Sequence, residues 1–380
     1  MTIKIVHLIT GLETGGAETT LYNLCCRLNR SKFCNTVISM TTRGTFGEML
    51  EAQGIPVYAL GMRRGAISLA GVYEAIRMLR SERPEILQTW LYHADLFGVV
   101  VAALSGVRKT IWNIRCSDMD MARYSWLSRA VLRLLPRLSR YPAVVIANSE
   151  HGKNVHVQLG YRPKRWMVIP NGIDVDVFRR SETAREELRD ELGLPRSAFL
   201  VGHIARFDPM KDHRTFLQAV AISTAKVPQI YAIMAGKGVE RCNNALTSVV
   251  NQLDLSERVK MLGERHDVAR LMAALDVVVM SSLFGEGFPN VVAEAMACET
   301  PCVVTDVGDS ARIVQDTGGI AMPGNAQMVA DAIVALANVE PERRRLLGRA
   351  ARQRICTHFD MATSVRSYER CYEEVAGVRS

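Results

Sequence analysis

The chain has 380 residues, of which 48% are hydrophobic and 23% charged, and its formal net charge is +8. This length suits two domains better than one core, and the composition is that of a globular protein, which excludes disordered and fibrous classes. Every apolar run is shorter than the about 18 residues that span a bilayer, and the first run ends at a turn without a cleavage site, so we expect neither a membrane span nor a signal peptide.

The first half of the chain alternates short β-branched runs with helical patterns. A strand at residues 3–9 is followed by a glycine-bearing turn at 11–16, and residues 17–29 then repeat leucine at helical spacing. Alternation of this kind is typical of a parallel sheet with helices on both faces. Further strands are predicted at 35–40, 56–60, 86–89, 110–114 and 143–148, and helices at 69–80 and 94–104.

A second alternating series follows residues 170–195, which open with a turn and are rich in Arg and Glu, as expected of an interdomain connection. We therefore predict two doubly wound α/β domains facing across a cleft, at residues 1–170 and 171–357, with a helix in residues 358–380 packing across their junction. Strands are predicted at 199–205, 229–235, 259–262, 277–280 and 302–305, and helices at 215–224, 239–253, 268–274, 290–298, 326–337 and 361–375.

The stretch 281–308 combines two carboxylates with the start of a helix. Glu286 stands between two glycines in a loop, a helix opens near Asn290, and Glu294 falls within its first two turns. Carboxylates can accept hydrogen bonds from sugar hydroxyls, and the unpaired amides at a helix start bind anions such as phosphate. Together these features indicate a site for a sugar nucleotide.

Further phosphate-binding candidates follow the first strand of each half. Arg206 and Lys211 would reach over the strand ends to neutralise a diphosphate and stabilise it as a leaving group; the alternative is a solvated basic loop. Gly15 and Gly16 let backbone amides approach a phosphate closely. Their turn lacks GxGxxG spacing, and no acidic residue ends the strand at 35–40, which disfavours nicotinamide and flavin cofactors.

Aromatic and polar residues follow or end two other strands of the first half. Because carboxyl ends of parallel strands meet at one edge of a sheet, we expect His93 to hydrogen-bond a bound sugar and its neighbours to help hold the acceptor. A histidine in such a position is also often purely structural. The residues are Tyr92 and His93 after one strand, and Trp112, Asn113 and Arg115 at the end of the next.

No metal site is indicated by the sequence. HExxH and Cys/His metal spacings are missing, and the nine cysteines show no CxxC spacing. Asp174 and Asp176 have DxD spacing, but they follow an Asn-Gly turn and suit a turn role. We therefore expect no metal and no cofactor, and reduced thiols in a cytoplasmic protein.

The positive charge is concentrated in one segment. Residues 106–166 hold 12 Lys or Arg against 3 Asp or Glu, a difference of +9. Within it, residues 121–141 carry five arginines and no acid. Two interpretations stay open for this part, an amphipathic helix on an anionic membrane surface or a helix packed on the sheet. Nucleic acid is not an expected partner, because no binding motif accompanies the charge.

Several motifs together resemble one family. The glutamates of FGEGFPNVVAEAMACETPCVVTDVG, Glu286 and Glu294, are similar to the paired-glutamate motif of the retaining glycosyltransferases of family 4, which have the GT-B fold. The likeness runs along essentially the whole chain, and TWLYHADLFG and IWNIR are similar to a bacterial subgroup that builds O-antigen, capsule or lipid-linked oligosaccharides. Other matching motifs are GGAE at 15–18, ANSE at 147–150, PNGID with Phe178, and LGERHDV at 262–268.

The resemblance implies a role for each matching residue. Glu294 would bind the ribose and Glu286 the donor sugar, while His93 matches the family histidine near that sugar. The implied catalytic residues are Glu286, His93, Arg206 and Lys211. The implied donor-binding residues are Gly15 and Gly16, Leu262 and Arg265 near the base, and Gly287, Phe288, Asn290, Val291 and Glu294.

The resemblance implies transfer of a hexose or N-acetylhexosamine, with retention, from a nucleotide sugar that we expect to be UDP-linked. The expected acceptor is an undecaprenyl-diphosphate-linked or other glycan, reached from the cytoplasm by a protein that is peripheral on the inner face of the membrane. Two alternatives stay open. One is a sugar-nucleotide 2-epimerase, against which the glutamate pair argues, and the other is a non-catalytic basic protein that binds a membrane surface.

Overall fold

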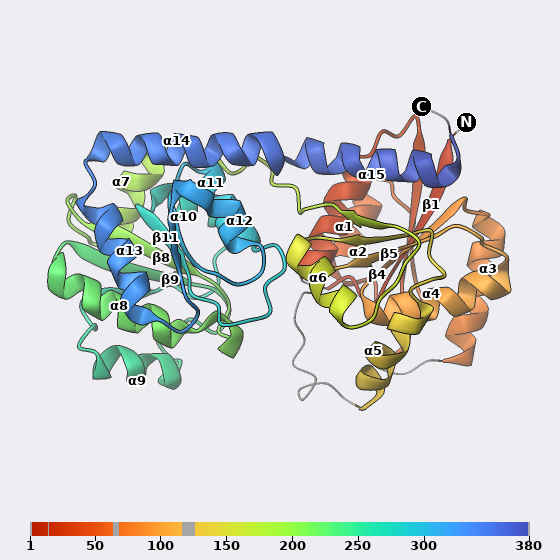
Figure 1. Cartoon of the computed structure of the whole chain (residues 1–380), viewed down its shortest axis with the longest axis horizontal. Helices are drawn as coiled ribbons and strands as arrows, with labels where there is room; N and C mark the ends of the chain where they lie inside the picture. Colours follow the sequence, from red (N-terminus) through yellow and green to blue (C-terminus); the bar gives the residue numbers. More distant parts are fainter. Residues whose placement is uncertain (1, 14, 64–67, 116–125, 379–380) are drawn as a thin grey trace. The chain divides into compact units, whose positions relative to one another are not determined.

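The computed structural model describes residues 2–13, 15–63, 68–115 and 126–378 (Figure 1). The chain forms two compact units, of which the first consists of Met1–Gly172 with Ala362–Ser380 and the second of Ile173–Met361. Each unit is built on one sheet in which the paired strands run parallel. The predicted α/β class with two doubly wound sheets is therefore confirmed.

The first unit has a seven-stranded sheet of order β3-β2-β1-β4-β5-β6-β7. The strand order changes direction between β1 and β4, the place where doubly wound sheets bind ligands beyond the carboxyl ends of their strands. The strands are β1 (Ile3–Ile9), β2 (Phe33–Ser39), β3 (Val57–Ala59), β4 (Ile86–Trp90), β5 (Thr110–Ile114), β6 (Val144–Ala147) and β7 (Trp166–Val168).

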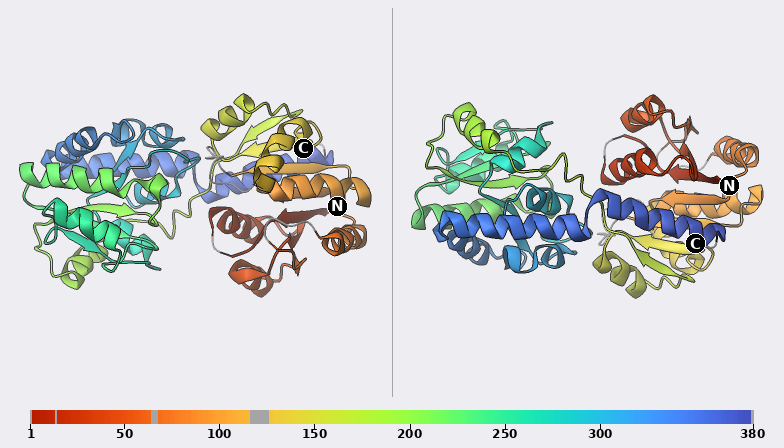
Figure 2. Two further views of the ribbon diagram at one scale, coloured as in Figure 1. Left: turned by 90° about the horizontal axis from the view of Figure 1, so that it is seen from below. Right: turned by 90° about the horizontal axis from the view of Figure 1, so that it is seen from above.

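Helices cover both faces of this sheet, as the two views of Figure 2 show. Strands covered on both sides are expected to be continuous apolar runs, and β6 is buried along its whole length. The helices are α1 (Gly16–Arg27), α2 (Gly44–Ala52), α3 (Leu69–Glu82), α4 (Tyr92–Ser105), α5 (Trp126–Leu138), α6 (Glu150–Gln158) and α15 (Met361–Ala376).

Helix α15 completes the core of the first unit although it comes last in the chain. The Tyr372 hydroxyl donates to Gln88 Oε1 at 2.5 Å, and its ring packs edge-on against Phe33. The Tyr368 ring stacks on Trp90 with the ring centres 6.4 Å apart. Both tyrosines are almost wholly buried. Helix α15 is therefore part of the core of the first unit and not a loosely attached surface helix.

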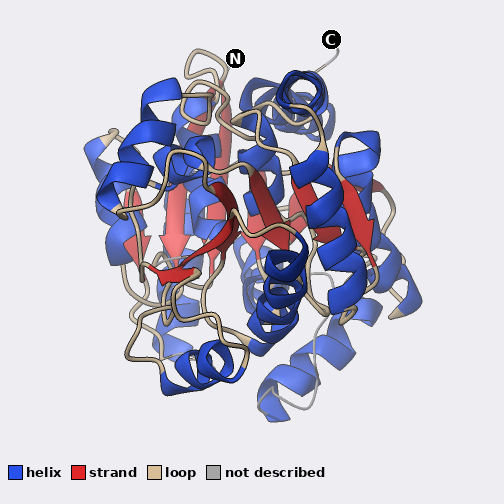
Figure 3. Cartoon of the chain, turned by 90° about the vertical axis from the view of Figure 1, so that its left-hand side faces the viewer, coloured by secondary structure: helices blue, strands red, loops and turns tan. Residues whose placement is uncertain are grey.

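The second unit has a six-stranded sheet of order β10-β9-β8-β11-β12-β13, which Figure 3 shows with helices on either side of the strands. Its strands are β8 (Phe199–Ile204), β9 (Ile230–Ala235), β10 (Val259–Met261), β11 (Val277–Met280), β12 (Cys302–Thr305) and β13 (Gly319–Ala321). Its helices are α7 (Glu182–Glu191), α8 (His213–Lys226), α9 (Asn244–Gln252), α10 (Val268–Ala274), α11 (Asn290–Ala297), α12 (Ser310–Val314), α13 (Ala326–Asn338) and α14 (Pro341–His358), and two 3-10 turns are η2 (Pro209–Lys211) and η3 (Gln315–Thr317).

The segment expected to be a connection, 170–195, instead contains helix α7 of the second unit. Arg189, which is 1% exposed, lies 2.9 Å from Asp276, and Arg185 contacts the other oxygen of that carboxylate at 2.6 Å. Buried charges are tolerated when they are paired and hydrogen-bonded. The Arg- and Glu-rich composition therefore belongs to an amphipathic helix whose partner lies far along the chain.

Candidate active site

Two aspartates shape the loop after β8. Asp208 accepts the Met210 amide at 2.9 Å and starts η2. Asp212, with φ of 44° in the left-handed region that Asp tolerates, then caps α8 by accepting the Thr215 amide at 3.1 Å. The two caps fix the loop that carries Lys211 at the carboxyl end of the second sheet.

Lys211 and Glu286 form an ion pair in this loop region. Lys211 Nζ lies 2.5 Å from Glu286 Oε1, and the two side chains are only 15% and 9% exposed. The same carboxylate oxygen accepts a hydrogen bond from Ser282 Oγ at 2.7 Å. Charges withdrawn from water must be paired, so each ion stabilises the other. The fold thus brings together two residues that the sequence assigned to the donor sugar and to the diphosphate.

The main chain at Lys211 is held by a second group of hydrogen bonds. Ser281 Oγ, which donates to main-chain carbonyls, lies 2.9 Å from Lys211 O and 3.0 Å from Asp212 O, and His203 Nε2 lies 3.0 Å from the same hydroxyl. Burial, with His213 and Lys211 nearby, lowers the pKa of His203 well below its ordinary value, so the ring is neutral. Ser281 and Ser282 were given no role by the sequence analysis, and their position directly after β11 is the signal that could have found them.

Arg206 lies at the surface of the second unit. Its side chain is 60% exposed, and its guanidinium contacts Asp208 Oδ2 at 3.2 and 3.3 Å. An exposed pair of this kind contributes little stability. Arg206 can therefore turn to an anionic ligand at little cost.

Helix α11 begins after Pro289, and no side chain caps its first turn. The Val291 amide has no hydrogen-bond partner among the described residues, which leaves it for an anion. Phe288 is 5% exposed and packs on Phe359, with the ring centres 5.3 Å apart, so only its main chain can face a ligand. The carbonyl of Gly287 accepts the Asp309 amide at 2.9 Å.

Glu294 lies in the second turn of α11. Its carboxylate has no hydrogen-bond or ion-pair partner among the residues that the structure describes. Burial raises its pKa to about 7. A largely buried carboxylate without a partner is costly, and hydroxyl groups of a ligand would supply the missing hydrogen bonds.

Gly308 fixes how closely the loop of Glu286 approaches the end of β12. Its φ is 64°, and a Cβ atom at this position would lie 2.4 Å from the carbonyl oxygen of Glu286. Real Cβ atoms do not approach a backbone oxygen so closely, and residues other than glycine rarely adopt this φ. The position of Glu286 therefore depends on a glycine 22 residues further along the chain.

Leu262 and Arg265, predicted to lie near the base, come between β10 and α10. Leu262 packs against the core of the second unit. The guanidinium of Arg265 makes two hydrogen bonds to Asp267 and one to Glu191, each at 2.8 Å, and these partners raise its pKa. These carboxylates occupy the edge of the Arg265 guanidinium, so its flat face is the part that can stack on a base.

In the first unit, Gly15 and Gly16 stand at the start of α1. Gly15 is the N-cap residue, and no side chain caps the helix. The Glu18 carboxylate lies over this glycine, since a Cβ atom on Gly15 would be 2.4 Å from Glu18 Oε2. A carboxylate is favourable at a helix start. A phosphate that binds to these amides would have to displace it.

His93 lies in the first turn of α4, next to a backbone conformation that is rare outside glycine. The N-cap residue, Leu91, has φ of 73°, and such strain is concentrated at functional sites. His93 is partly buried, which lowers its pKa, and its Nε2 lies 3.3 Å from Ser128 Oγ. Tyr92 is 8% exposed, and its hydroxyl lies 2.8 Å from His156 Nε2. Of the two predicted residues, His93 is the one that a ligand can reach.

The residues that end β5 are held inside the first unit rather than at its rim. Trp112 and Asn113 are 0% exposed, because β5 lies between β4 and β6 in the sheet. Asn113 Nδ2 donates to the Tyr368 hydroxyl at 2.8 Å. Arg115, one residue beyond the strand, donates to Thr20 Oγ1 at 2.7 Å and is only partly buried. Among these three, Arg115 is the residue that an acceptor can contact directly.

Of residues 121–141, for which a membrane-surface helix and a helix packed on the sheet were both left open, the structure describes those from Trp126 onwards, and 121–125 lie outside the described residues. In α5, Trp126 is 70% and Leu134 42% exposed, whereas Leu135 is fully buried in the core of the first unit. The helix thus packs on one side and keeps apolar and basic groups exposed on another. Within the described ranges, no helix is long and apolar enough to cross a bilayer.

The described part of the chain contains no group of three or more His, Cys, Asp or Glu side chains that could hold a metal ion.

Two family models match the chain, one for each half. Residues 14–177 match the model described as Glycosyltransferase Family 4, and residues 198–338 match the model described as Glycosyl transferases group 1. These matches include the loop of Gly15, the loop of Lys211 and the stretch from Glu286 to Glu294.

Similar proteins are known from several bacteria. The chain is 26% identical to the putative glycosyltransferase EpsF of Bacillus subtilis over 313 residues, which are 80% of this chain and 79% of EpsF. It is 25% identical to the UDP-Gal:alpha-D-GlcNAc-diphosphoundecaprenol alpha-1,3-galactosyltransferase of Escherichia coli over 66% of this chain and 64% of that protein. The structure of Anabaena Alr3699/HepE in complex with UDP and glucose is 26% identical, with a TM-score of 0.83, and the alignment covers 98% of this chain and 100% of that one.

Proposed function

Because the chain belongs to the family 4 glycosyltransferases with the GT-B fold, we propose that it transfers a hexose or N-acetylhexosamine from a UDP-sugar to a lipid-linked glycan. The observation that carries this proposal is the ion pair of Lys211 and Glu286, which the fold places in the same unit as the uncapped start of α11. Residues 171–357 would bind the nucleotide sugar, and residues 1–170 would serve the acceptor.

For the donor, the second unit contains carboxylates that can accept hydrogen bonds from hydroxyls and cationic or amide groups that can bind a diphosphate. The unpaired carboxylate of Glu294 suits the two ribose hydroxyls, and the carboxylate of Glu286 is proposed to contact hydroxyls of the sugar. Lys211, Arg206 and the Val291 amide would hold the diphosphate. UDP is proposed because HepE, which resembles this chain over its full length, was crystallised with UDP and with UDP-glucose.

For the mechanism, we propose retention of the anomeric configuration by attack on the same face as the departing group. Glu286 is held by Lys211 and Ser282 and is assigned to sugar hydroxyls, so it is not available as a nucleophile. The acceptor oxygen forms the new bond to the anomeric carbon while the bond to the diphosphate breaks, and the departing phosphate oxygen takes the acceptor proton. Lys211, Arg206 and the helix start stabilise the charge that develops on the diphosphate, and we propose that no metal is needed.

For the acceptor, we propose an undecaprenyl-diphosphate-linked glycan at the cytoplasmic face of the membrane. The E. coli relative is named for an acceptor of that kind. The exposed Trp126 and Leu134 of α5, next to arginines at 129 and 133, form a surface that suits anionic lipid. Peripheral binding through this helix would bring the first unit to its substrate.

The test is a screen of nucleotide sugars by thermal shift, followed by reaction with a lipid-linked acceptor and NMR of the product. Stabilisation by one UDP-sugar, and a product whose anomeric configuration matches the donor, would support the proposal. An inverted product would exclude the retaining mechanism. Conversion of the donor without any acceptor would instead indicate the 2-epimerase, which the comparisons do not favour because the similar proteins are named as transferases.

A further inference from the structure

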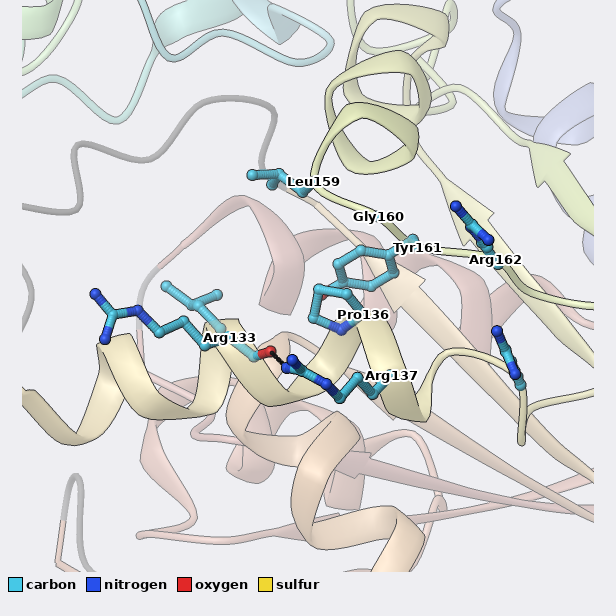
Figure 4. A pocket seen from close by; sticks show the side chains of 9 residues that line it. Arg133, Pro136, Arg137, Leu159, Gly160, Tyr161 and Arg162 are labelled. Carbon is cyan, nitrogen blue, oxygen red and sulfur yellow. Dashed lines mark hydrogen bonds between the residues drawn. The ribbon is translucent and has the colours of Figure 1, made fainter.

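A cavity of about 720 Å³ lies in the first unit, between the carboxyl-terminal part of α5 and the turn that leads from α6 to β7 (Figure 4). Its apolar lining comes from Leu132, Pro136, Leu159 and Tyr161. Ligand pockets have volumes of about 300–1,000 Å³. The cavity is therefore large enough for an organic ligand and not only for a single small ion.

The two walls of the cavity are joined by a buried serine. Ser139, which is 0% exposed, donates through its hydroxyl to the Pro136 carbonyl at 2.7 Å and accepts the Arg162 amide at 2.8 Å. Gly160, with φ of 91°, makes the turn on the opposite wall. The end of α5 and the turn before β7 are thus held in a fixed arrangement.

Four arginines line this cavity, namely Arg133, Arg137, Arg140 and Arg162. None of them forms an ion pair with a carboxylate among the described residues. Among the described residues, these four arginines make one side-chain hydrogen bond, from Arg137 Nη1 to the Arg133 carbonyl at 3.2 Å, within one exposed helical turn. Four unpaired like charges repel one another, and guanidinium groups bind phosphate oxygens in a bidentate manner.

The cavity is remote from the catalytic edge of its sheet. Arg140 precedes β6 and Arg162 precedes β7, so both stand at the amino ends of parallel strands. Gly15, His93 and Arg115 all follow strands and stand at the carboxyl ends. A strand of five residues such as β4 spans roughly 17 Å. A ligand in the cavity would therefore not be the group that reacts.

We propose that this cavity is a second binding site, for a molecule that carries a phosphate or diphosphate on an apolar remainder. The arginines would bind the phosphate oxygens, and Leu132, Pro136, Leu159 and Tyr161 would contact the apolar part. Such a group can belong to a lipid in a membrane or to a free phosphorylated compound. The proposal does not depend on the identity of the donor or on the acceptor chemistry.

The first experiment is a calorimetric titration of the full-length chain with inorganic pyrophosphate at fixed ionic strength. Every protein in the series carries Lys211→Ala, which weakens binding at the proposed donor site to the same extent in each. The test variant is Arg137→Gln with Arg162→Gln, one residue from each wall of the cavity. The matched control is Arg83→Gln with Arg108→Gln, two exposed arginines that line another cavity at the same edge of the sheet.

In a second series, the same proteins with Lys211 restored are floated with vesicles of phosphatidylcholine alone or with phosphatidylglycerol added. If the source is a free phosphate compound, the test variant binds pyrophosphate at least about 10-fold more weakly than the control. If the source is a lipid headgroup, the test variant loses binding to the anionic vesicles and the control keeps it. Equal losses in both variants would show only unspecific charge attraction and would overturn the proposal, as would the absence of any effect in both series. Within each series, a melting temperature equal to that of the parent protein verifies that a variant folds.

Discussion

Lys211 Nζ and Glu286 Oε1 face each other across two loops of the second unit, and both side chains are almost hidden from solvent. The two residues are 75 positions apart in the chain. Lys211 therefore has two roles. It balances the charge of Glu286, and it is proposed to hold the diphosphate of the donor. If Lys211 has the proposed catalytic role, stability and catalysis are coupled at this pair.

Replacement of Lys211 by Ala is expected to lower both the turnover rate and the free energy of unfolding. At saturating donor, the turnover rate should fall by about 10²–10³-fold, the usual cost of losing one preorganised group that stabilises developing charge. The free energy of unfolding should fall by about 3 kcal/mol, because Glu286 is left buried without its counterion. Lys211→Ala combined with Glu286→Gln should recover much of the stability, measured by urea unfolding, and none of the rate. Near-normal turnover of the single variant would remove Lys211 from the catalytic set.

Glu294→Gln is expected to stabilise the empty protein at alkaline pH while weakening donor binding. Burial raises the pKa of this carboxyl from 4.5 to about 7, so in the folded state it keeps its proton where the unfolded chain has lost it. The wild type therefore loses stability relative to the variant as pH rises from 4.5 to 7. The difference of 2.5 units corresponds to at most about 3 kcal/mol.

Melting curves of both proteins at pH 5 and pH 8, with and without donor, check this prediction. Relative to the wild type, the variant should melt much higher at pH 8 than at pH 5, and the donor should stabilise it less than the wild type. The Michaelis constant of the wild type for its donor should rise as pH falls below about 7, because a protonated carboxyl can accept fewer hydrogen bonds from ribose. A variant that melts lower than the wild type at pH 8 would contradict the assigned environment.

Gly308→Ala is expected to reduce activity by displacing the loop of Glu286. The added methyl group would lie 2.4 Å from the Glu286 carbonyl oxygen, so the loop has to move. Gly193→Ala is the matched control, since its φ of 62° is nearly the same as the 64° of Gly308 and no atom lies within 4 Å of the added carbon. Both variants should lose about 1–2 kcal/mol through the backbone conformation alone. Only Gly308→Ala should in addition lower the turnover rate, and equal rates would show that the loop tolerates the shift.

Replacement of Trp126 by Ser together with Arg129 by Gln is expected to weaken binding to anionic vesicles. Trp126 is 70% exposed at the start of α5, where an aromatic ring and a nearby cation can enter the headgroup region. Tyr73→Ser on α3 serves as the control, because that ring is 67% exposed in the same unit. Flotation should show a several-fold loss for the α5 variant alone. Equal retention of all three proteins would assign the helix to a different role.

The sequence predicted the sheets well wherever a strand is a buried apolar run of four residues or more. β1, β5, β11 and β12 have the predicted bounds. β7 and β13, of three residues each, were not predicted, whereas the equally short β3 and β10 lie within predicted strands. Helix α7 was predicted to be a connection, because its Arg and Glu residues are unfavourable for burial without a partner. The partner of Arg189 is Asp276, which lies 87 positions further along the chain.

In the candidate site, the sequence could identify residues by motif but could not give their surroundings. Chain position predicts that Trp112 lies in a strand, but only the strand order shows that the neighbouring strands β4 and β6 bury it. The hydrogen bond from Ser282 to Glu286 and the one between Ser281 and His203 depend on how three loops approach one another. Such contacts are not encoded in any local spacing, so the supporting hydroxyl groups were missed.

Helix α15 determines the order in which the two units can complete their folding during synthesis. Tyr368 and Tyr372 cover Trp90 and Phe33, yet they leave the ribosome about 280 or more residues later, as the separation of 284 positions between Gln88 and Tyr372 shows. All residues of the second unit are synthesised before this helix. The unit whose synthesis begins first is therefore the last to be completed, and until then it exposes aromatic rings that a chaperone can recognise.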